Sequence, residues 1–400
     1  MLLPILLIYF SIPQIFCFFE DKSLYNETYY DYLKAQKRLF NDLFTDYDAG
    51  ISPVFTRNVY SRTDDPLVRG TQPFLWNYTL FLYYFKLVEV DEPSEKVGVV
   101  LEIMEYWYDA RLAWNVSNYN NISMIYVRQE KVWSPTFSTF AVNDIQDFRD
   151  QDFRLVGIMP EGLVYSYIPA RISANCRLDV SHFPFDTQTC QIQISLPIFD
   201  NREVKILNEI YSGVLEPSKF EQMGNSEWRI LNLSASLEAL RFTDAFGNIQ
   251  LSIFEIKMKR NPLYYIYMIV FPSFIINSLS IIGVFIMESD KMSRLNVGLT
   301  NIMTMTFILG VMADKIPKSG EVPLLGIYII VNLLIMIFAI MVTIMLNRLR
   351  KWIVRDKKDR SKSSKLEDFV GRPFEMILIT VLHLVNLANF GMILVYWYIT

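Results

Sequence analysis

Four long apolar segments follow residue 261, and they limit what this chain can fold into more than any other feature. They cover residues 262–287, 295–313, 322–346 and 374–399. An α-helix rises about 1.5 Å per residue, so roughly 20 apolar residues cross the hydrocarbon core of a bilayer. The aromatic run Tyr396–Tyr398 at the end of the fourth segment suits a membrane–water interface. The sequence therefore predicts four transmembrane helices.

The ends of the chain and one basic segment predict its orientation. Residues 347–372, between the third and fourth spans, are dense in Lys and Arg, which the positive-inside rule places in the cytoplasm as a short loop. Residues 1–19 are apolar and uncharged, which predicts a cleaved signal peptide, with a membrane anchor as the alternative. A cleaved signal puts residues 20–261 outside the cell. Four crossings then return the C-terminus outside, and the expected location is the plasma membrane.

Glycosylation sequons and cysteines support an extracellular first part. The sequons begin at Asn26, Asn77, Asn115, Asn121 and Asn232, all before residue 261. Loss of the signal peptide removes Cys17 and leaves Cys176 and Cys190. Two cysteines in a secreted context predict one disulfide.

The region before the spans has the pattern of a β-sandwich. Short alternating segments at 78–87, 97–106 and 250–258 are separated by turn residues, and residues 31–43 indicate a short helix. The predicted fold is a multi-domain membrane protein. An extracellular antiparallel β-sandwich, residues 20–261, precedes a four-helix transmembrane bundle, residues 262–400. The net charge of −4 does not point to a nucleic-acid partner.

Several motifs occur in a specific order along this chain. Thirteen residues separate Cys176 from Cys190 and include Phe183-Pro184-Phe185-Asp186. The other motifs are Trp107-Tyr-Asp-Ala-Arg-Leu-Ala-Trp114, Trp133-Ser-Pro135 and Arg260-Asn-Pro262. Together with four spans, this series resembles the Cys-loop receptor family of pentameric ligand-gated ion channels, as a divergent, invertebrate-like member.

The resemblance implies a neurotransmitter receptor subunit that assembles with four identical or related subunits in the lipid bilayer. A small-molecule agonist would bind between neighbouring extracellular domains and open a pore for ions, with a postsynaptic membrane as one location. It implies no cofactor. In the sequence itself we find no nucleophile motif, phosphate loop or metal cluster, so an enzyme is not predicted. The rival from another class is a non-conducting four-span adhesion or accessory protein.

The second span carries a mixed stripe that suits a pore. Its members recur at spacings of three and four and so share one helix face: Asn296, Thr300, Met303, Phe307, Gly310 and Asp314. In a five-fold ring this face would line a pore with a hydrophobic centre, where Met303 and Phe307 could gate by dewetting. The resemblance implies a hydrophobic constriction at Met303. The alternative is a helix whose polar residues bond to its neighbours.

Ion selectivity is predicted less directly. The resemblance implies that residues just before the second span influence ion selectivity, namely Glu288, Asp290, Ser293 and Arg294. The length from Pro272 to Arg294 matches anion channels, but Met292-Ser293 replaces their Pro-Ala pair and acidic residues lie nearby. Asp314 would add an acidic ring at the outer mouth. We predict cation permeation, with a chloride channel as the alternative.

Aromatic residues are the candidate ligand contacts, because agonist pockets in the family often hold an amine by cation–π contact. The candidates are Trp107 on the complementary face and Phe199, Phe242 and Phe246 on the principal face. Each could instead belong to the sandwich core. Pro197 stands where acetylcholine receptors commonly carry tryptophan, and the later loop lacks an adjacent cysteine pair. A standard acetylcholine site is therefore not expected.

Coupling between the two domains is expected where they meet. The resemblance implies that Arg260 pairs with acidic residues at the base of the sandwich, Asp186 among them. It also implies that Phe183, Pro184 and Phe185 press on the turn that contains Pro317. The alternative for Arg260 is a simple juxtamembrane cation.

Overall fold

The chain forms two compact units. A computed structural model describes residues 27–54, 76–140, 142–201, 203–241, 248–286, 291–316, 320–357 and 372–399. The first unit comprises residues up to 55, 106–134 and 151–166, and the second comprises residues 56–105, 135–150 and everything from 167 onward. Each unit is described by itself below.

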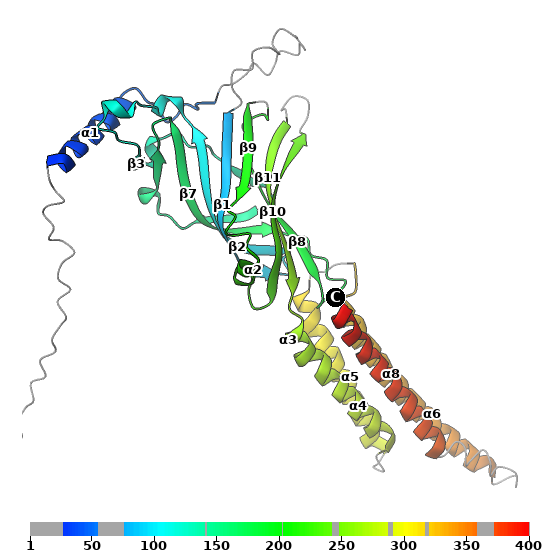
Figure 1. Cartoon of the computed structure of the whole chain (residues 1–400). Helices are drawn as coiled ribbons and strands as arrows, with labels where there is room; N and C mark the ends of the chain where they lie inside the picture. The colour runs from blue at the N-terminus through cyan, green and yellow to red at the C-terminus, as the bar shows by residue number, and fades with distance from the viewer. Residues whose placement is uncertain are drawn as a thin grey trace, which may run out of the picture. The chain divides into compact units, whose positions relative to one another are not determined.

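The first unit holds helix α1 (Glu27–Phe44), several 3-10 turns and a small antiparallel pair of strands (Figure 1). The strands are β3 (Ile125–Arg128) and β6 (Leu155–Ile158). The Trp107–Trp114 motif has a structural role here. Buried Asp109 accepts hydrogen bonds from the Arg111 guanidinium at 2.7 and 2.9 Å and from the Tyr47 hydroxyl at 2.8 Å.

The remaining strands build two sheets. They are β1 (Trp76–Asp91), β2 (Lys96–Tyr108), β4 (Ser138–Phe140), β5 (Val142–Asp147), β7 (Leu163–Asn175), β8 (Thr187–Ser195), β9 (Val204–Ile210), β10 (Trp228–Arg241) and β11 (Asn248–Arg260). One sheet contains β7-β2-β1-β9 in that order with β5 beside β7, and the other has the order β10-β11-β8-β4. A short helix, α2 (Pro217–Met223), precedes β10. These sheets confirm the predicted β-sandwich.

One strand pair departs from the predicted antiparallel pattern. Strands β1 and β9 run parallel, in register from Trp76↔Val204 to Leu82↔Ile210. The pairings β10–β11 and β11–β8 are antiparallel, as expected. Alternation along a strand reports which face is buried but carries no information on the direction of the partner strand, so this exception could not be predicted from the pattern.

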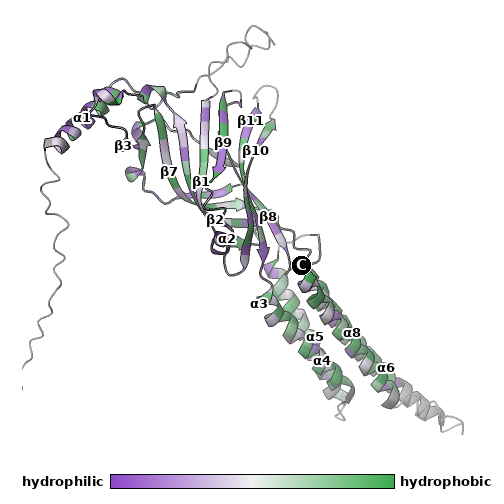
Figure 2. Cartoon of the chain, in the orientation of Figure 1, coloured by the Kyte–Doolittle hydropathy of each residue, from purple (hydrophilic) through white to green (hydrophobic). Residues whose placement is uncertain are grey.

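Within the described part of the chain, four helices are long and apolar enough to cross a membrane, which agrees with the four predicted spans. The first begins as α3 (Leu263–Tyr265), passes through a π-helical turn (Ile266–Val270) and continues as α4 (Phe271–Ile286). The π turn ends two residues before Pro272, which lacks the N–H of a regular helix. The others are α5 (Lys291–Lys315), α6 (Leu324–Lys357) and α8 (Arg372–Ile399). Figure 2 shows the hydrophobic colouring of these helices against the mixed colouring of the strands.

Two helices extend beyond the apolar segments that the sequence predicts as spans. Helix α5 runs from Lys291 to Lys315 rather than over 295–313, and α6 continues to Lys357, through the start of the segment predicted as a loop from 347. Residues 347–357 contain Leu, Arg and Lys, which are good helix formers, and neither Gly nor Pro interrupts them. The helix therefore extends beyond its apolar part. The predicted signal peptide, residues 1–19, lies outside the described residues.

Candidate functional site

The disulfide loop between β7 and β8 is closed as predicted. Cys176 and Cys190 are joined, with Cα atoms 5.3 Å apart. The apolar tip of the loop is buried, because Phe183 is 4% and Phe185 is 2% exposed. Residues that would be exposed in an isolated hairpin are therefore covered by the rest of the second unit.

Membrane helices supply part of that cover. The backbone N–H groups of Leu324 and Leu325, at the start of α6, donate to the carbonyl oxygens of Ser181 at 3.0 Å and Phe183 at 3.1 Å. Two aromatic contacts add to these bonds: Phe183 with Tyr265 at 4.7 Å and Phe185 with Tyr396 at 6.2 Å between ring centroids. The loop thus contacts the first, third and fourth spans. Pro317, the predicted contact, lies outside the described residues.

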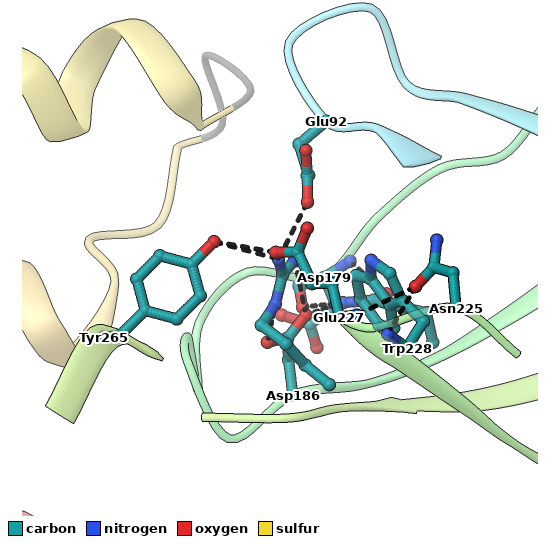
Figure 3. A network of polar contacts seen from close by, with 9 residues as sticks. Glu92, Asp179, Asp186, Asn225, Glu227, Trp228 and Tyr265 are labelled. Carbon is teal, nitrogen blue, oxygen red and sulfur yellow. Dashed lines mark hydrogen bonds and ion pairs between the residues drawn. The ribbon is translucent and has the colours of Figure 1, made fainter. Parts of the chain in front are cut away.

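Arg260, the last residue of β11, sits at the centre of an acidic group that we call the Arg260 centre. Its guanidinium Nε donates to Asp186 Oδ1 at 2.9 Å and its Nη1 donates to Glu92 Oε1 at 2.8 Å. Nη1 also pairs with Glu227, which accepts a hydrogen bond from the Tyr265 hydroxyl at 2.7 Å. Figure 3 shows Glu92 of the turn after β1, Asp186 of the disulfide loop, Glu227 just before β10 and Tyr265 of the first membrane helix in one network. The structure therefore contains the Arg260–Asp186 pair and adds two further acids.

The electrostatics of this centre follow from its burial. The Arg260 side chain is fully buried and lies 4.1 Å from the Trp228 ring centroid and 4.8 Å from that of Phe183. Burial by itself would lower the pKa of Arg260, but attraction and hydrogen bonding to Asp186 and Glu92 outweigh it, so the pKa lies above its ordinary value. The guanidinium stays charged and ties the end of the sheet to the loop.

Another buried acid lies inside the sandwich. Glu105 of β2 is 2% exposed and accepts a hydrogen bond from the Tyr78 hydroxyl of β1. Burial raises the pKa of Glu105 to about 7, despite the opposing effects of the Tyr78 bond and of Arg149. Arg149 itself pairs with Asp147 at 2.9 Å. Glu105 therefore titrates near neutral pH.

Asparagine side chains join all four membrane helices in a cluster that the motif analysis did not find. Asn277 of α4 donates to Asn386 of α8 at 2.9 Å and accepts from Asn301 of α5 at 3.2 Å. Asn332 of α6 accepts from Asn277 at 3.4 Å and from Asn389 of α8 at 2.9 Å. All five are buried. In an apolar bundle such amide bonds hold helices together.

Helix α5 has two opposite faces. Its buried residues include Gly298, Asn301, Met305 and Met312, and the predicted pore stripe of Asn296, Thr300, Met303, Phe307, Gly310 and Asp314 is exposed throughout. Met303 and Phe307 are 75% and 71% exposed. Residues two apart differ by about 200° around a helix, so the stripe faces away from the side that packs on the other helices.

The structure describes two of the four predicted ligand residues, Trp107 and Phe199. Trp107 is fully buried, as expected for the alternative in which it belongs to the sandwich core. Phe199 is half-buried in the turn after β8. Phe242 and Phe246 lie outside the described residues. The alternation along β2 indicates the same burial, because Trp107 is in phase with the buried residues Val99, Leu101 and Ile103.

Other predicted positions can be placed only in part. Of the selectivity residues, Glu288 and Asp290 lie outside the described residues, while Ser293 and Arg294 belong to the first turn of α5. Four sequon asparagines, Asn77, Asn115, Asn121 and Asn232, are exposed, and Asn26 falls outside the described part of the chain. Within the described ranges, no group of three or more metal-binding side chains could hold an ion.

Comparison with known proteins agrees with this architecture. The sequence profile described as the neurotransmitter-gated ion-channel ligand binding domain matches residues 36–262, and that of the neurotransmitter-gated ion-channel transmembrane region matches residues 269–381. Among curated proteins, neuronal acetylcholine receptor subunit alpha-9 of Gallus gallus is 28% identical over 300 residues, which cover 75% of this chain and 58% of that subunit.

Two nematode proteins give similar matches. Betaine receptor acr-23 of Caenorhabditis elegans is 24% identical, over 74% of this chain and 55% of the receptor. Ligand-gated ion channel 4 of Caenorhabditis briggsae is 27% identical, over 72% of this chain and 44% of the channel. The chain thus spans about half the length of these relatives. The matched family consists of ion channels rather than enzymes. On the profiles, the fold and the disulfide loop, the chain belongs to the Cys-loop family of neurotransmitter-gated ion channels.

Proposed function

We propose that this chain is one subunit of a pentameric channel that opens when a small molecule binds its extracellular β-sandwich. Helix α5 from five subunits lines the pore. The observation that carries the proposal is the exposed stripe on α5, which lies opposite the face that packs against the other helices. A pore-lining helix needs such a face, since it has water or a symmetry-related copy, rather than its own bundle, in front of it.

The stripe divides the pore into zones. Asn296 and Thr300 give polar rings at the cytoplasmic end, and Asp314 gives an acidic ring at the other end. Met303 and Phe307 form a hydrophobic constriction between them, which closes by dewetting when the helices approach one another.

Cysteine accessibility tests the pore assignment. In the full chain expressed in cells, Met303→Cys should react with a small, charged thiol reagent, and Met305→Cys, on the buried face, should not. Labelling is read by mass spectrometry, so the result does not require a measured current. Equal labelling of the two variants would contradict the pore assignment, as would faster labelling at 305.

Cations are the proposed permeant ions, because Asp314 places a carboxylate on the exposed face of α5. The alternative, a chloride channel, is favoured by the length of the segment from Pro272 to Arg294. Reversal potentials in low-sodium and low-chloride solutions separate the two. A shift with chloride alone would overturn the cation proposal.

The proposed agonist is a small molecule held by aromatic side chains on the extracellular domain. Acetylcholine and betaine come first in a test panel, because similar proteins are named as receptors for them. Pro197 in place of tryptophan favours a changed pocket, so compounds without a quaternary amine belong in the panel too. A non-conducting accessory protein, the rival function, would give no current in any subunit combination.

The proposed topology places residues 20–261 and the C-terminus outside the plasma membrane and the 347–372 segment inside. The exposed sequon residues Asn77, Asn115, Asn121 and Asn232 support this orientation. Digestion with a glycosidase should increase the gel mobility of the protein from cells. Unchanged mobility would remove the support that the sequons give.

A further inference from the structure

Helix α5 has one polar link to the other membrane helices within the part of the chain that the structure describes. Asn301 is 2% exposed, and its Nδ2 donates to Asn277 Oδ1 of α4 at 3.2 Å. Its Oδ1 is buried and bonds to no other described residue, so the link is this one bond. The hydroxyls of Thr304 and Thr306 donate instead to backbone carbonyl oxygens of α5 itself.

The partner of Asn301 is itself held in place. Asn277 Nδ2 donates to Asn386 Oδ1 of α8 at 2.9 Å and to Asn332 Oδ1 of α6 at 3.4 Å. An amide nitrogen has two hydrogens to donate, and both are used here. The oxygen that receives Asn301 therefore has an orientation set by two other helices.

The apolar contacts of α5 give little preference for one rotation about its axis. Its buried face carries Gly298, Met305 and Met312, whereas the exposed face carries Met303 and Phe307. Methionine adapts to irregular surroundings. Lipid tails are as apolar as these side chains, so burying one methionine rather than another gains little. A hydrogen bond, in contrast, is directional.

Gly298 is the competing determinant of the rotation. A Cβ at this position would lie 2.5 Å from Ile340 Cδ1 of α6, so the two helices approach closely there. This contact restricts the distance between α5 and α6, but it contains no hydrogen bond. The two determinants act on different neighbours and can be separated by substitution.

The helix geometry connects the Asn301 bond to the exposed stripe. Residues two apart on an α-helix differ by about 200°, so Asn301 and Met303 lie on opposite sides of α5. When Asn301 is bonded to α4, Met303 is directed away from the bundle. It is accordingly 75% exposed.

We propose that Asn301 is a positioning residue of the channel: its hydrogen bond to Asn277 fixes the rotation of α5 and thereby turns Met303 and Phe307 towards the pore. The inference rests on the proposed function for the identity of the pore, while the rotation itself is a property of the bundle. Without this bond, α5 turns about its axis and the stripe loses its fixed orientation.

Cysteine labelling of the full chain in cells tests the rotation, with a small, charged thiol reagent and detection by mass spectrometry. With Asn301 present, Met303→Cys should react faster than Met305→Cys. In the Asn301→Leu background, the ratio of the two rates should fall by roughly 10-fold. That factor corresponds to about 1.4 kcal/mol, which lies within the range of interhelical amide bonds.

Two further backgrounds remove the same bond in other ways. Asn277→Leu removes its acceptor, and Asn301→Ala removes its donor without adding bulk. Each should lower the ratio as Asn301→Leu does. The combination Asn277→Leu/Asn301→Leu should lower it no further, because both substitutions delete one shared interaction.

Asn389→Leu is the matched control from the same cluster. Asn389 Nδ2 donates to Asn332 Oδ1 at 2.9 Å and to the Tyr328 carbonyl oxygen at 3.1 Å, which joins α8 to α6 without touching α5. This variant should lower Tm as Asn301→Leu does but keep the labelling ratio of the wild-type background. The ratio thus reports the rotation of α5 rather than a general loss of stability.

Two results would overturn this inference alone. An unchanged ratio in Asn301→Leu and Asn301→Ala would assign the rotation to the Gly298–Ile340 contact. An equal fall in Asn389→Leu would show a general loosening of the bundle. Equal labelling of positions 303 and 305 with Asn301 present would instead contradict the pore assignment together with the inference, so the two failures are distinguishable.

Discussion

Replacing Arg260 with methionine would leave three acids without the positive charge that they surround. Asp186 is almost fully buried, with 1% of its side chain exposed, and Glu92 is 16% exposed. Methionine fills much of the arginine volume, so the variant removes the charge and its hydrogen bonds while keeping most of the packing. The acids would then repel one another with no cation between them.

The expected loss of stability is large for a single substitution. Removing one partner of a buried ion pair costs about 3–5 kcal/mol, because the other charge stays buried without compensation. For a domain of this size, each kcal/mol lowers Tm by roughly 2–4 °C, so Arg260→Met should lower Tm by roughly 10 °C. Thermal unfolding of the purified full chain, followed by tryptophan fluorescence, measures the shift.

Arg171→Met is the matched control. Arg171 pairs with Glu89 at 2.7 Å, as close as the pairs of Arg260, but the two side chains are 43% and 61% exposed. An exposed pair contributes less than about 1 kcal/mol, so this variant should shift Tm by no more than roughly 4 °C. If the two variants lowered Tm equally, burial would not be the reason why the Arg260 centre stabilises the protein.

Three further predictions test other parts of the structure by the same melting assay. Burial raises the pKa of Glu105 to about 7, so the folded state is most stable below the ordinary pKa of this carboxyl, and the free energy of unfolding falls by about 3 kcal/mol in all as pH rises through 7. Glu105→Gln should flatten this dependence between pH 5 and 8. An unchanged slope would exclude Glu105 as its source. Gly298→Ala should destabilise the protein by about 1–3 kcal/mol, because the added Cβ would lie 2.5 Å from a side-chain carbon of α6. Gly310→Ala has open space around its Cβ and should be neutral or slightly stabilising. Similar losses of stability in the two variants would contradict the α5–α6 packing. Asn277→Leu should cost about 1–2 kcal/mol through its amide bonds, and no loss would show that the cluster is not structural.

The membrane half of the fold could be predicted from the sequence because its signal is local. A continuous apolar run of the right length has few other structural solutions. The helix ends were harder, since Leu346 ends the apolar part of α6 but not the helix. Hydropathy reports where lipid ends, and helix formers decide where the helix ends, so the two boundaries need not coincide.

The buried polar groups depended on long-range contacts that no local pattern encodes. The acids of the Arg260 centre come from positions 92, 186 and 227, far apart in the chain. The disulfide-loop motif indicated only one of them, Asp186. The asparagines are single polar residues in apolar helices, and each helix sequence alone does not say which neighbour it faces. Strand parity, by contrast, was available and assigns Glu105 and Trp107 to the buried face of β2.

Polarity alone does not identify the exposed face of α5. Thr300 and Asn301 are adjacent polar residues in an apolar helix, and either would suit a water-filled pore. The structure separates them: Thr300 is exposed, and Asn301 is 2% exposed and donates to Asn277. The exposed face includes the apolar Met303 and Phe307, while the buried face includes an amide. The proposed pore is therefore defined by what the other helices leave uncovered, and its hydrophobic constriction follows from that packing rather than from the polarity of the helix.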